Sequence, residues 1–294
     1  MSPPSPIERY AALVGRPATV QVLKDKPGRR RTVRLTGRRG SVIVKWYASD
    51  RAATVAARVA ALAAGPRDPA VPALIHLDVD SHTAVLTDMP GTPLGDAIEA
   101  GDLDACHRAG AAVGRWHRFW LGHPPSALRA HSVDRELAIL HDRADAAPAG
   151  IAAAVRRAAI GLDASWTCTT AVHRDLYEQQ ILVGDRVALI DLDDAAAGPP
   201  ELDVGNLLAH LYLAGHRNRR RLAAARAALM DGYLAAGPPL NAGLLIQCVS
   251  LALLRLACIH TEPALIELAA CPVDENTLMV ASCSGPTGGA AWWQ

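Results

Sequence analysis

Two carboxylates and one side-chain amide stand close together between His173 and Asp191. Asp175 lies in a polar stretch, Gln180 follows five residues later at the start of a short apolar run, and Asp191 ends a second apolar run. Carboxylate and amide oxygens are hard ligands that suit Mg²⁺, and a carboxylate that the metal does not use can accept a proton. The stretch therefore predicts metal-assisted chemistry with a proton transfer.

A tight hairpin must bring these side chains together. Residues 180–183 and 187–190 are apolar runs of strand type, and Gly184-Asp185-Arg186 between them is a turn signal. Antiparallel return along this hairpin places Gln180 beside Asp191. The alternative is a surface hairpin with scattered acids, but the order, the spacing and the strand context together favour the functional interpretation.

His173-Arg174-Asp175, followed by Gln180 and Ile190-Asp191, resembles the catalytic loop and metal-binding segment of the protein-kinase-like fold. The aminoglycoside phosphotransferase and choline kinase branch is the most similar; its loop commonly reads His-Gly-Asp-x-x-x-x-Asn, and here Gln180 stands at the Asn position. The resemblance implies that Asp175 is the catalytic base and that Gln180 and Asp191 bind Mg²⁺. His173 and Arg174 would support the loop.

The same resemblance implies an α+β, bilobal protein-kinase-like fold, with a small antiparallel β-sheet N-lobe and a larger, mainly helical C-lobe. We expect a nucleotide-binding N-lobe over residues 1–90, with a sheet and one helix. We expect a helical C-lobe over 91–281, with the catalytic loop and the acceptor site, and a flexible Gly-rich tail over 282–294.

Strand patterns in the first lobe lie at 19–23, 32–36 and 41–47, with a turn over 24–29. The third strand carries Lys45, which by the resemblance would hold the α- and β-phosphates of ATP; the alternative is a surface lysine. The first turn, with Lys26 and Gly28, would cover the phosphates. It lacks a G-x-G-x-x-G pattern, so an ordinary hairpin turn explains it equally well.

The helix pattern at 50–64 departs from the family. Arg58 lies near the position where this helix should supply a Glu to pair with the strand lysine. Lys45 would then need Asp191 or a phosphate as its partner, and a catalytically inactive relative stays open. Further along, Asp88-Met89-Pro90 matches the hinge between lobes. Because Pro90 has no N–H, the Asp88 carbonyl and the Met89 amide should meet adenine.

Three other polar residues carry weaker expectations. Asp193 is either a second metal contact or, as we prefer, a loop acid that accepts hydrogen bonds from backbone amides. Asp203 is expected to be the N-cap of a helix over 204–214. His117, near the end of a helix pattern over 103–120, is expected to be a packed or capping histidine rather than a metal ligand.

Composition limits the partners. The net charge is +1, but residues 8–58 hold thirteen basic residues against three acids, which suits phosphates, an acidic partner, or solvated strand edges. Six cysteines without metal-type spacing indicate reduced thiols and a cytoplasmic protein. The apolar run 244–259 contains Gln247 and Arg255, so we expect no membrane contact, and we expect no nucleic-acid partner.

The sequence thus favours an ATP- and Mg²⁺-dependent kinase that phosphorylates a hydroxyl of a small molecule. From Glu201 onward there are seven acids and six arginines, which is not the acidic bowl that a polycationic aminoglycoside would need. Two alternatives stay open. One is a Ser/Thr kinase acting on a peptide in natural-product (RiPP or lanthipeptide-type) maturation, with the basic N-lobe binding an acidic partner. The other is a non-catalytic pseudokinase that binds a nucleotide or a partner.

Overall fold

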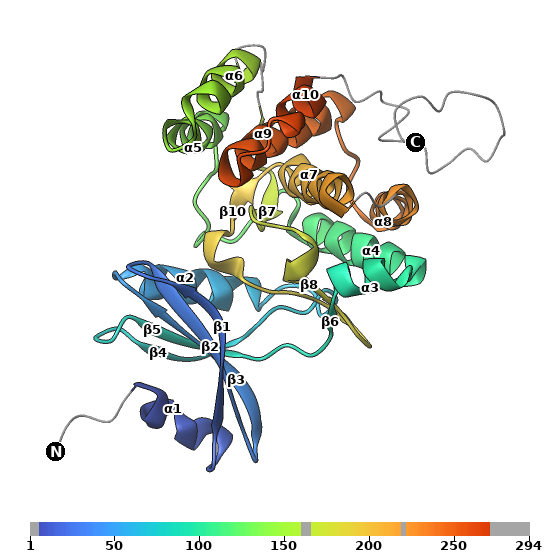
Figure 1. Ribbon diagram of the computed structural model, residues 1–294. Helices are drawn as coiled ribbons and strands as arrows, with labels where there is room; N and C mark the ends of the chain where they lie inside the picture. The colour runs from blue at the N-terminus through green and yellow to red at the C-terminus, as the bar shows by residue number, and fades with distance from the viewer. Residues whose placement is uncertain (1–5, 160–165, 219–221, 271–294) are drawn as a thin grey trace.

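The computed structural model describes residues 6–159, 166–218 and 222–270. Its N-terminal part is a five-stranded antiparallel sheet with two helices, and its C-terminal part is mostly helical (Figure 1). The expected α+β architecture is therefore confirmed. The expected flexible tail, 282–294, lies outside the described residues.

The small-lobe sheet has the strand order β1-β2-β3-β5-β4. Its strands are β1 (Thr19–Lys26), β2 (Arg30–Gly37), β3 (Gly40–Tyr47), β4 (Leu74–Asp78) and β5 (Thr83–Thr87). The predicted turn over 24–29 was too long, because the pairs Lys24–Thr32 and Lys26–Arg30 continue the ladder and leave only three residues to connect β1 and β2.

Strand register gives the two faces of this sheet different chemistry. Side chains alternate along a strand, and directly paired residues share a face. One face therefore carries two rows of polar residues: Lys24, Thr32 and Lys45, then Lys26, Arg30 and Tyr47. The other face packs its valines and leucines against helix α1 (Pro6–Val14). Helix α2 (Arg51–Leu62) lies on the side of the polar face and buries Val55, Val59 and Leu62.

Helix α9 (Ala242–His260) is central to the large lobe. It packs against α7 (Pro200–Asn218), α10 (Ala264–Ala270), α5 (Val133–Asp145) and α6 (Ala149–Ala159). Among the described helices it alone is long and apolar enough to cross a membrane, yet 61% of its most apolar stretch is buried inside the lobe. That burial is what a core helix requires, since an apolar helix needs apolar neighbours on every side.

The remaining helices of the large lobe form a second layer beside α7. These are α3 (Leu94–Ala100), α4 (Leu103–Trp120) and α8 (Ala223–Ala236). Helices α4 and α8 approach closely because glycines stand at their crossing: a Cβ on Gly110 would lie 1.9 Å from the Leu229 carbonyl oxygen. The small residues of both helices therefore set this contact.

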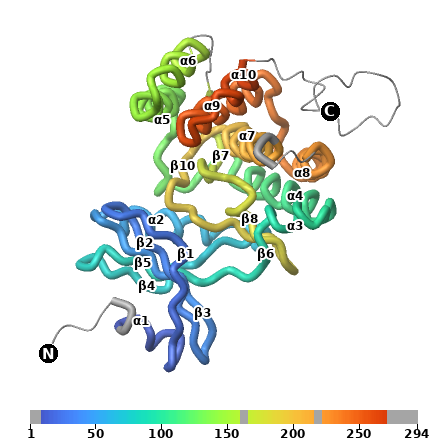
Figure 2. The backbone as a smooth tube through the Cα atoms, in the orientation of Figure 1, coloured from blue at the N-terminus to red at the C-terminus, as the bar shows by residue number. Residues whose placement is uncertain are grey.

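Short strands lie between the sheet and the helices (Figures 1 and 2). Strand β7 (Thr170–Val172) pairs with β10 (Ala196–Gly198), and β8 (Ile181–Val183) pairs with β9 (Val187–Leu189), which confirms the predicted hairpin. Strand β6 (Thr92–Pro93) joins β8. Two single-turn 3₁₀ helices, η1 (Glu178–Gln180) and η2 (Leu192–Asp194), hold the polar loops that follow β7 and β9.

Candidate active site

Lys45 of the small lobe pairs with Asp191 of the large lobe. Lys45 lies on β3, is 4% exposed, and donates from Nζ to Asp191 Oδ1 at 2.7 Å. Asp191, two residues beyond the end of β9, adopts a left-handed conformation with φ of 60°, which turns the chain into η2. The prediction that Asp191 could hold Lys45 in place of the missing Glu is confirmed. Burial acts to raise the pKa of Asp191, but the charges of Lys45 and Arg30 outweigh it and hold that pKa well below its usual range.

Asp193 is the second acceptor for Lys45. Its Oδ1 lies 2.6 Å from Lys45 Nζ, its Oδ2 accepts from the Tyr47 hydroxyl at 2.8 Å, and Arg30 also donates to it. The carboxylate is 2% exposed. Its donors are thus side chains of the small-lobe sheet, and the backbone amides that we preferred from sequence are not its partners. The possible role of Asp193 as a metal contact stays a prediction.

Helix α2 contacts the same segment through arginines. Arg58 donates from Nη1 to the Asp193 carbonyl oxygen, and Arg51 Nη2 lies 2.5 Å from Asp194 Oδ1. The helix position that lacks a Glu is therefore occupied by a cation that binds the backbone of η2. Burial lowers the pKa of Arg58, Asp194 opposes this, and the neighbouring charges of Arg51, Arg174 and Arg129 lower it further.

Asp203 binds the backbone of the predicted catalytic loop, residues 173–175. The amides of His173 and Arg174 donate to its two carboxylate oxygens at 2.6 and 2.7 Å, and His117 Nε2 lies 3.1 Å from Oδ2. The N-cap prediction for Asp203 is wrong, because α7 begins at Pro200 and Asp203 falls inside its first turn. His117 is a packed histidine, as predicted: it is fully buried between Asp203 and the hydroxyl of Tyr233.

The fastened loop presents Asp175. Arg174 has a φ of 70°, and His173 donates from Nε2 to the Ile190 carbonyl at 2.7 Å, which ties the loop to the end of β9. Burial raises the pKa of Asp175, although the charges of His173 and Arg255 oppose the shift. Among the described residues no group donates a hydrogen bond to the Asp175 carboxylate. It is therefore available to an incoming hydroxyl group.

Gln180 lies opposite Ile190, one residue short of the predicted pairing with Asp191. Gln180 is buried, and its carbonyl accepts the Ile190 amide at 3.0 Å, so the two residues are neighbours across the hairpin. The side-chain amide of Asn206 donates from Nδ2 to the Leu176 carbonyl at 2.8 Å and supports the loop between Asp175 and Gln180.

The predicted nucleotide contacts lie at two places in the small lobe. Gly28 has a φ of 69° in the turn between β1 and β2, and Lys26 precedes it on the polar face of the sheet. Burial lowers the pKa of Lys26, as do Lys24, Arg29 and Arg30, whereas Asp175 raises it. At the hinge, the Asp88 carboxylate binds Arg34 Nε at 2.7 Å and Ser41 Oγ at 2.6 Å. In the described part of the chain, no backbone hydrogen bond holds the Asp88 carbonyl or the Met89 amide.

The donor set fits ATP with Mg²⁺. Mg²⁺ is usually held by one or two carboxylates together with substrate phosphates and water, so Asp191 and Asp193 with the Gln180 amide suffice. In the described residues no group of three or more His, Cys, Asp or Glu side chains is placed to hold a metal ion. The cations on the polar face of the sheet, Lys45 above all, can form charge-assisted hydrogen bonds with such phosphates.

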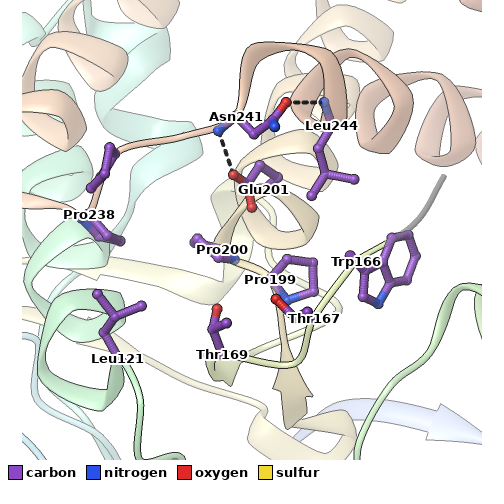
Figure 3. A pocket seen from close by; sticks show the side chains of 11 residues that line it. Leu121, Trp166, Thr167, Thr169, Pro199, Pro200, Glu201, Pro238, Asn241 and Leu244 are labelled. Atoms are coloured by element: carbon purple, nitrogen blue, oxygen red, sulfur yellow. Dashed lines mark hydrogen bonds between the residues drawn. The ribbon is translucent and has the colours of Figure 1, made fainter.

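A hollow of about 430 Å³ lies apart from these residues, at the start of α7 (Figure 3). Trp166, Pro200 and Glu201 are among its lining residues. The backbone N–H of Asn241 donates to Glu201 Oε1 at 2.7 Å. None of the predicted site residues lines it. The candidate catalytic residues therefore lie outside this hollow, on the loops between the lobes.

Two contributors to the site were missed from sequence. Arg30 binds both Asp191 and Asp193, and Asp203 orients the catalytic loop. Extending the strand alternation of β2 back through the arginine run would have placed Arg30 on the face of Lys45. No local signal distinguishes Asp203 from an N-cap, because its partners lie far away in the sequence.

A family model described as phosphotransferase enzyme family matches residues 26–240. A search of curated proteins gave no significant match. Among solved structures, macrolide 2'-phosphotransferase MphH from Brachybacterium faecium is 20% identical, with a TM-score of 0.55 over 90% of this chain and 96% of that chain.

Two further structures share the fold. Choline kinase from Cryptosporidium parvum is 9% identical, with a TM-score of 0.64 over 92% of this chain and 98% of that chain. Aminoglycoside phosphotransferase APH(4)-Ia, solved with AMP-PNP and hygromycin B, is 15% identical, with a TM-score of 0.54 over 88% and 93%. These likenesses establish the kinase-like fold, and the family match covers most of the chain, so the protein belongs to the phosphotransferase enzyme family.

Proposed function

We propose that the protein transfers the γ-phosphoryl group of ATP to a hydroxyl group of a small molecule. The observation that carries this proposal is the arrangement at the catalytic loop. Asp203 holds the loop by two backbone amides, and the loop presents a carboxylate, Asp175, to which no described group donates. Lys45, from the small-lobe sheet, is already paired with Asp191.

Each residue then has a chemical role. Asp175 orients the acceptor hydroxyl and receives its proton as the bond from oxygen to the γ-phosphorus forms and the bond to the β-phosphate oxygen breaks, so that ADP leaves. Lys45 binds phosphate oxygens, and the hinge groups of Asp88 and Met89 hold the adenine edge. Mg²⁺, bound by Asp191 and Gln180, would neutralise charge on the phosphates. Catalysis of this type depends on positioning and electrostatics, with no covalent intermediate.

Arginines gather around Arg58 and Asp194. Arg58 interacts electrostatically with Arg51, Arg129 and Arg174, and Asp194 interacts with Arg51, Arg58 and Arg174. A polycation would be repelled by these charges, so we favour a neutral or anionic small molecule over an aminoglycoside. The macrolide, choline and hygromycin named for the related structures belong to those proteins.

One observation favours a second candidate, a Ser/Thr kinase for peptides. Arg29, Arg38 and Arg39 are exposed at the turns of the small-lobe sheet, where an acidic peptide segment would find complementary charge. This surface lies on the nucleotide-binding lobe, so the peptide would have to reach from there to Asp175.

The test is mass spectrometry of a panel of small-molecule alcohols and of Ser/Thr peptides with acidic leaders, each incubated with ATP, Mg²⁺ and the protein. We expect one phosphoryl group on a small molecule with the wild type and none with Asp175→Asn. Phosphorylation of peptides alone would support the second candidate. Nucleotide binding without any turnover across the panel would identify a non-catalytic protein and overturn the proposal.

A further inference from the structure

Arg30 joins the small-lobe sheet to the carboxylates of Asp191 and Asp193. It is the first residue of β2 and follows the turn that contains Gly28. Its Nη1 lies 2.8 Å from Asp191 Oδ1 and its Nη2 lies 3.0 Å from Asp191 Oδ2, which is a bidentate pair, and Nη1 also donates to Asp193. The side chain is 14% exposed. Arg30 is therefore the closest cation to both carboxylates besides Lys45.

The polar face of the small-lobe sheet carries more positive charge than the two carboxylates beside it carry negative charge. Lys24, Arg30 and Lys45 all have a nitrogen within 3.7 Å of an Asp191 oxygen, so three cations meet the two carboxylates of Asp191 and Asp193. Lys26 stands beside Arg30 in the same row of the sheet. An excess of partly buried cations attracts an anion with several charged oxygens, and a nucleotide polyphosphate is such an anion.

A divalent metal ion held by Asp191 would compete with Arg30 for the same carboxylate oxygens. Both oxygens of Asp191 accept from the guanidinium, and a guanidinium and a metal ion repel each other at such short range. A guanidinium fork also matches phosphate oxygens as well as it matches a carboxylate. The backbone of Arg30 is fixed by pairing with Lys26 and Tyr47, so a change of partner needs only side-chain rotation.

We propose that Arg30 exchanges partners when a nucleotide binds. Without nucleotide its guanidinium holds Asp191 and Asp193. With nucleotide it binds the phosphate oxygens and leaves both carboxylates to the metal. Arg30 is thus a second phosphate-binding cation of the small lobe beside Lys45, and also the group that keeps the metal ligands paired in the empty protein. This inference rests on the proposed function, because it takes ATP as the ligand of the site.

The test separates phosphate binding from metal binding in Arg30→Gln. Calorimetric titration with ADP in the absence of metal should show affinity about tenfold or more below the wild type, since a charge-assisted bidentate contact is lost. Titration with Mn²⁺ alone, followed by electron paramagnetic resonance, should show tighter binding, because the competing cation is gone. Arg30→Lys keeps the charge but not the fork, and its ADP affinity should lie between the two.

Arg31→Gln is the matched control. Arg31 is the next residue of β2, lies on the opposite face, is exposed, and faces Asp25 at 3.7 Å. Both of its affinities should stay within about twofold of the wild type. Thermal melts of all variants establish that they are folded.

The outcomes are distinct. ADP affinity in Arg30→Gln equal to that of the Arg31→Gln control would overturn the inference while leaving the proposed function intact. Weaker ADP binding without any gain in Mn²⁺ binding would overturn the exchange. A wild-type protein that binds no ADP would overturn the proposed function, and the inference with it.

Discussion

Replacing Asp203 with Asn tests whether one buried carboxylate sets the catalytic loop. Asp203 is fully buried, and three donors converge on it: the amides of His173 and Arg174, and the ring of His117. Asn has one acceptor oxygen, so its NH₂ group must face at least one N–H donor. Hydrogen bonds to a charged group contribute about 1.5–3 kcal/mol each. We therefore expect Asp203→Asn to lower the free energy of unfolding by about 2–4 kcal/mol at neutral pH.

Urea unfolding followed by circular dichroism measures this change. Asp231→Asn is the control, because Asp231 lies on α8 with a side chain that is 60% exposed, and it should change the unfolding free energy by less than about 0.5 kcal/mol. The phosphoryl-transfer rate of Asp203→Asn should fall while its ADP affinity stays unchanged, since Asp203 orients the loop and faces no nucleotide contact. A loss of stability below about 1 kcal/mol with full transfer rate would refute this account of the loop.

Three further expectations follow from the same contacts. Burial raises the pKa of Asp175, so the acidic limb of the profile of kcat/KM against pH should lie above the usual range of an Asp; a limb at or below that range would contradict its role as base. Burial acts to raise the pKa of Glu136, but Arg255 and His131 lower it to about 2 from 4.5. Because the folded pKa is depressed, the stability that Glu136 contributes is present above pH 4.5 and is lost as the pH falls toward about 2, so Glu136→Gln should flatten acid unfolding curves in that window. Lys45→Met removes the buried cation between Asp191 and Asp193 and should weaken ADP binding by about tenfold or more in calorimetry.

Much of the site follows from short-range patterns. The hairpin of β8 and β9 was predictable because two apolar runs flank a turn signal, but its register places Gln180 opposite Ile190, the residue before Asp191. The pairing of Lys45 with Asp191 was one of two predicted possibilities, because Arg58 stands where an acid is needed and the lysine then takes Asp191 or a phosphate. In each case, the information lies in residues that are close in sequence or in a single missing charge.

The rest depends on contacts that no local pattern encodes. Asp203 reads as an N-cap until its distant partner His117 is placed beside it, and the true start of α7 at Pro200 removes that reading. Arg30 lies in a run of arginines where charge hides the strand alternation, so the predicted strand began at residue 32, whereas β2 begins at Arg30. Asp193 was expected to bind backbone amides because loop acids commonly do, whereas Tyr47 and Lys45 reach it from another lobe.

The central claim is that Asp175 accepts the proton during phosphoryl transfer from ATP. The most direct measurement follows transfer from γ-labelled ATP to an accepting alcohol with the wild type and with Asp175→Asn, and measures ADP binding of both by calorimetry. We predict that the variant binds ADP as the wild type does and transfers no label. Full transfer by Asp175→Asn would contradict the claim.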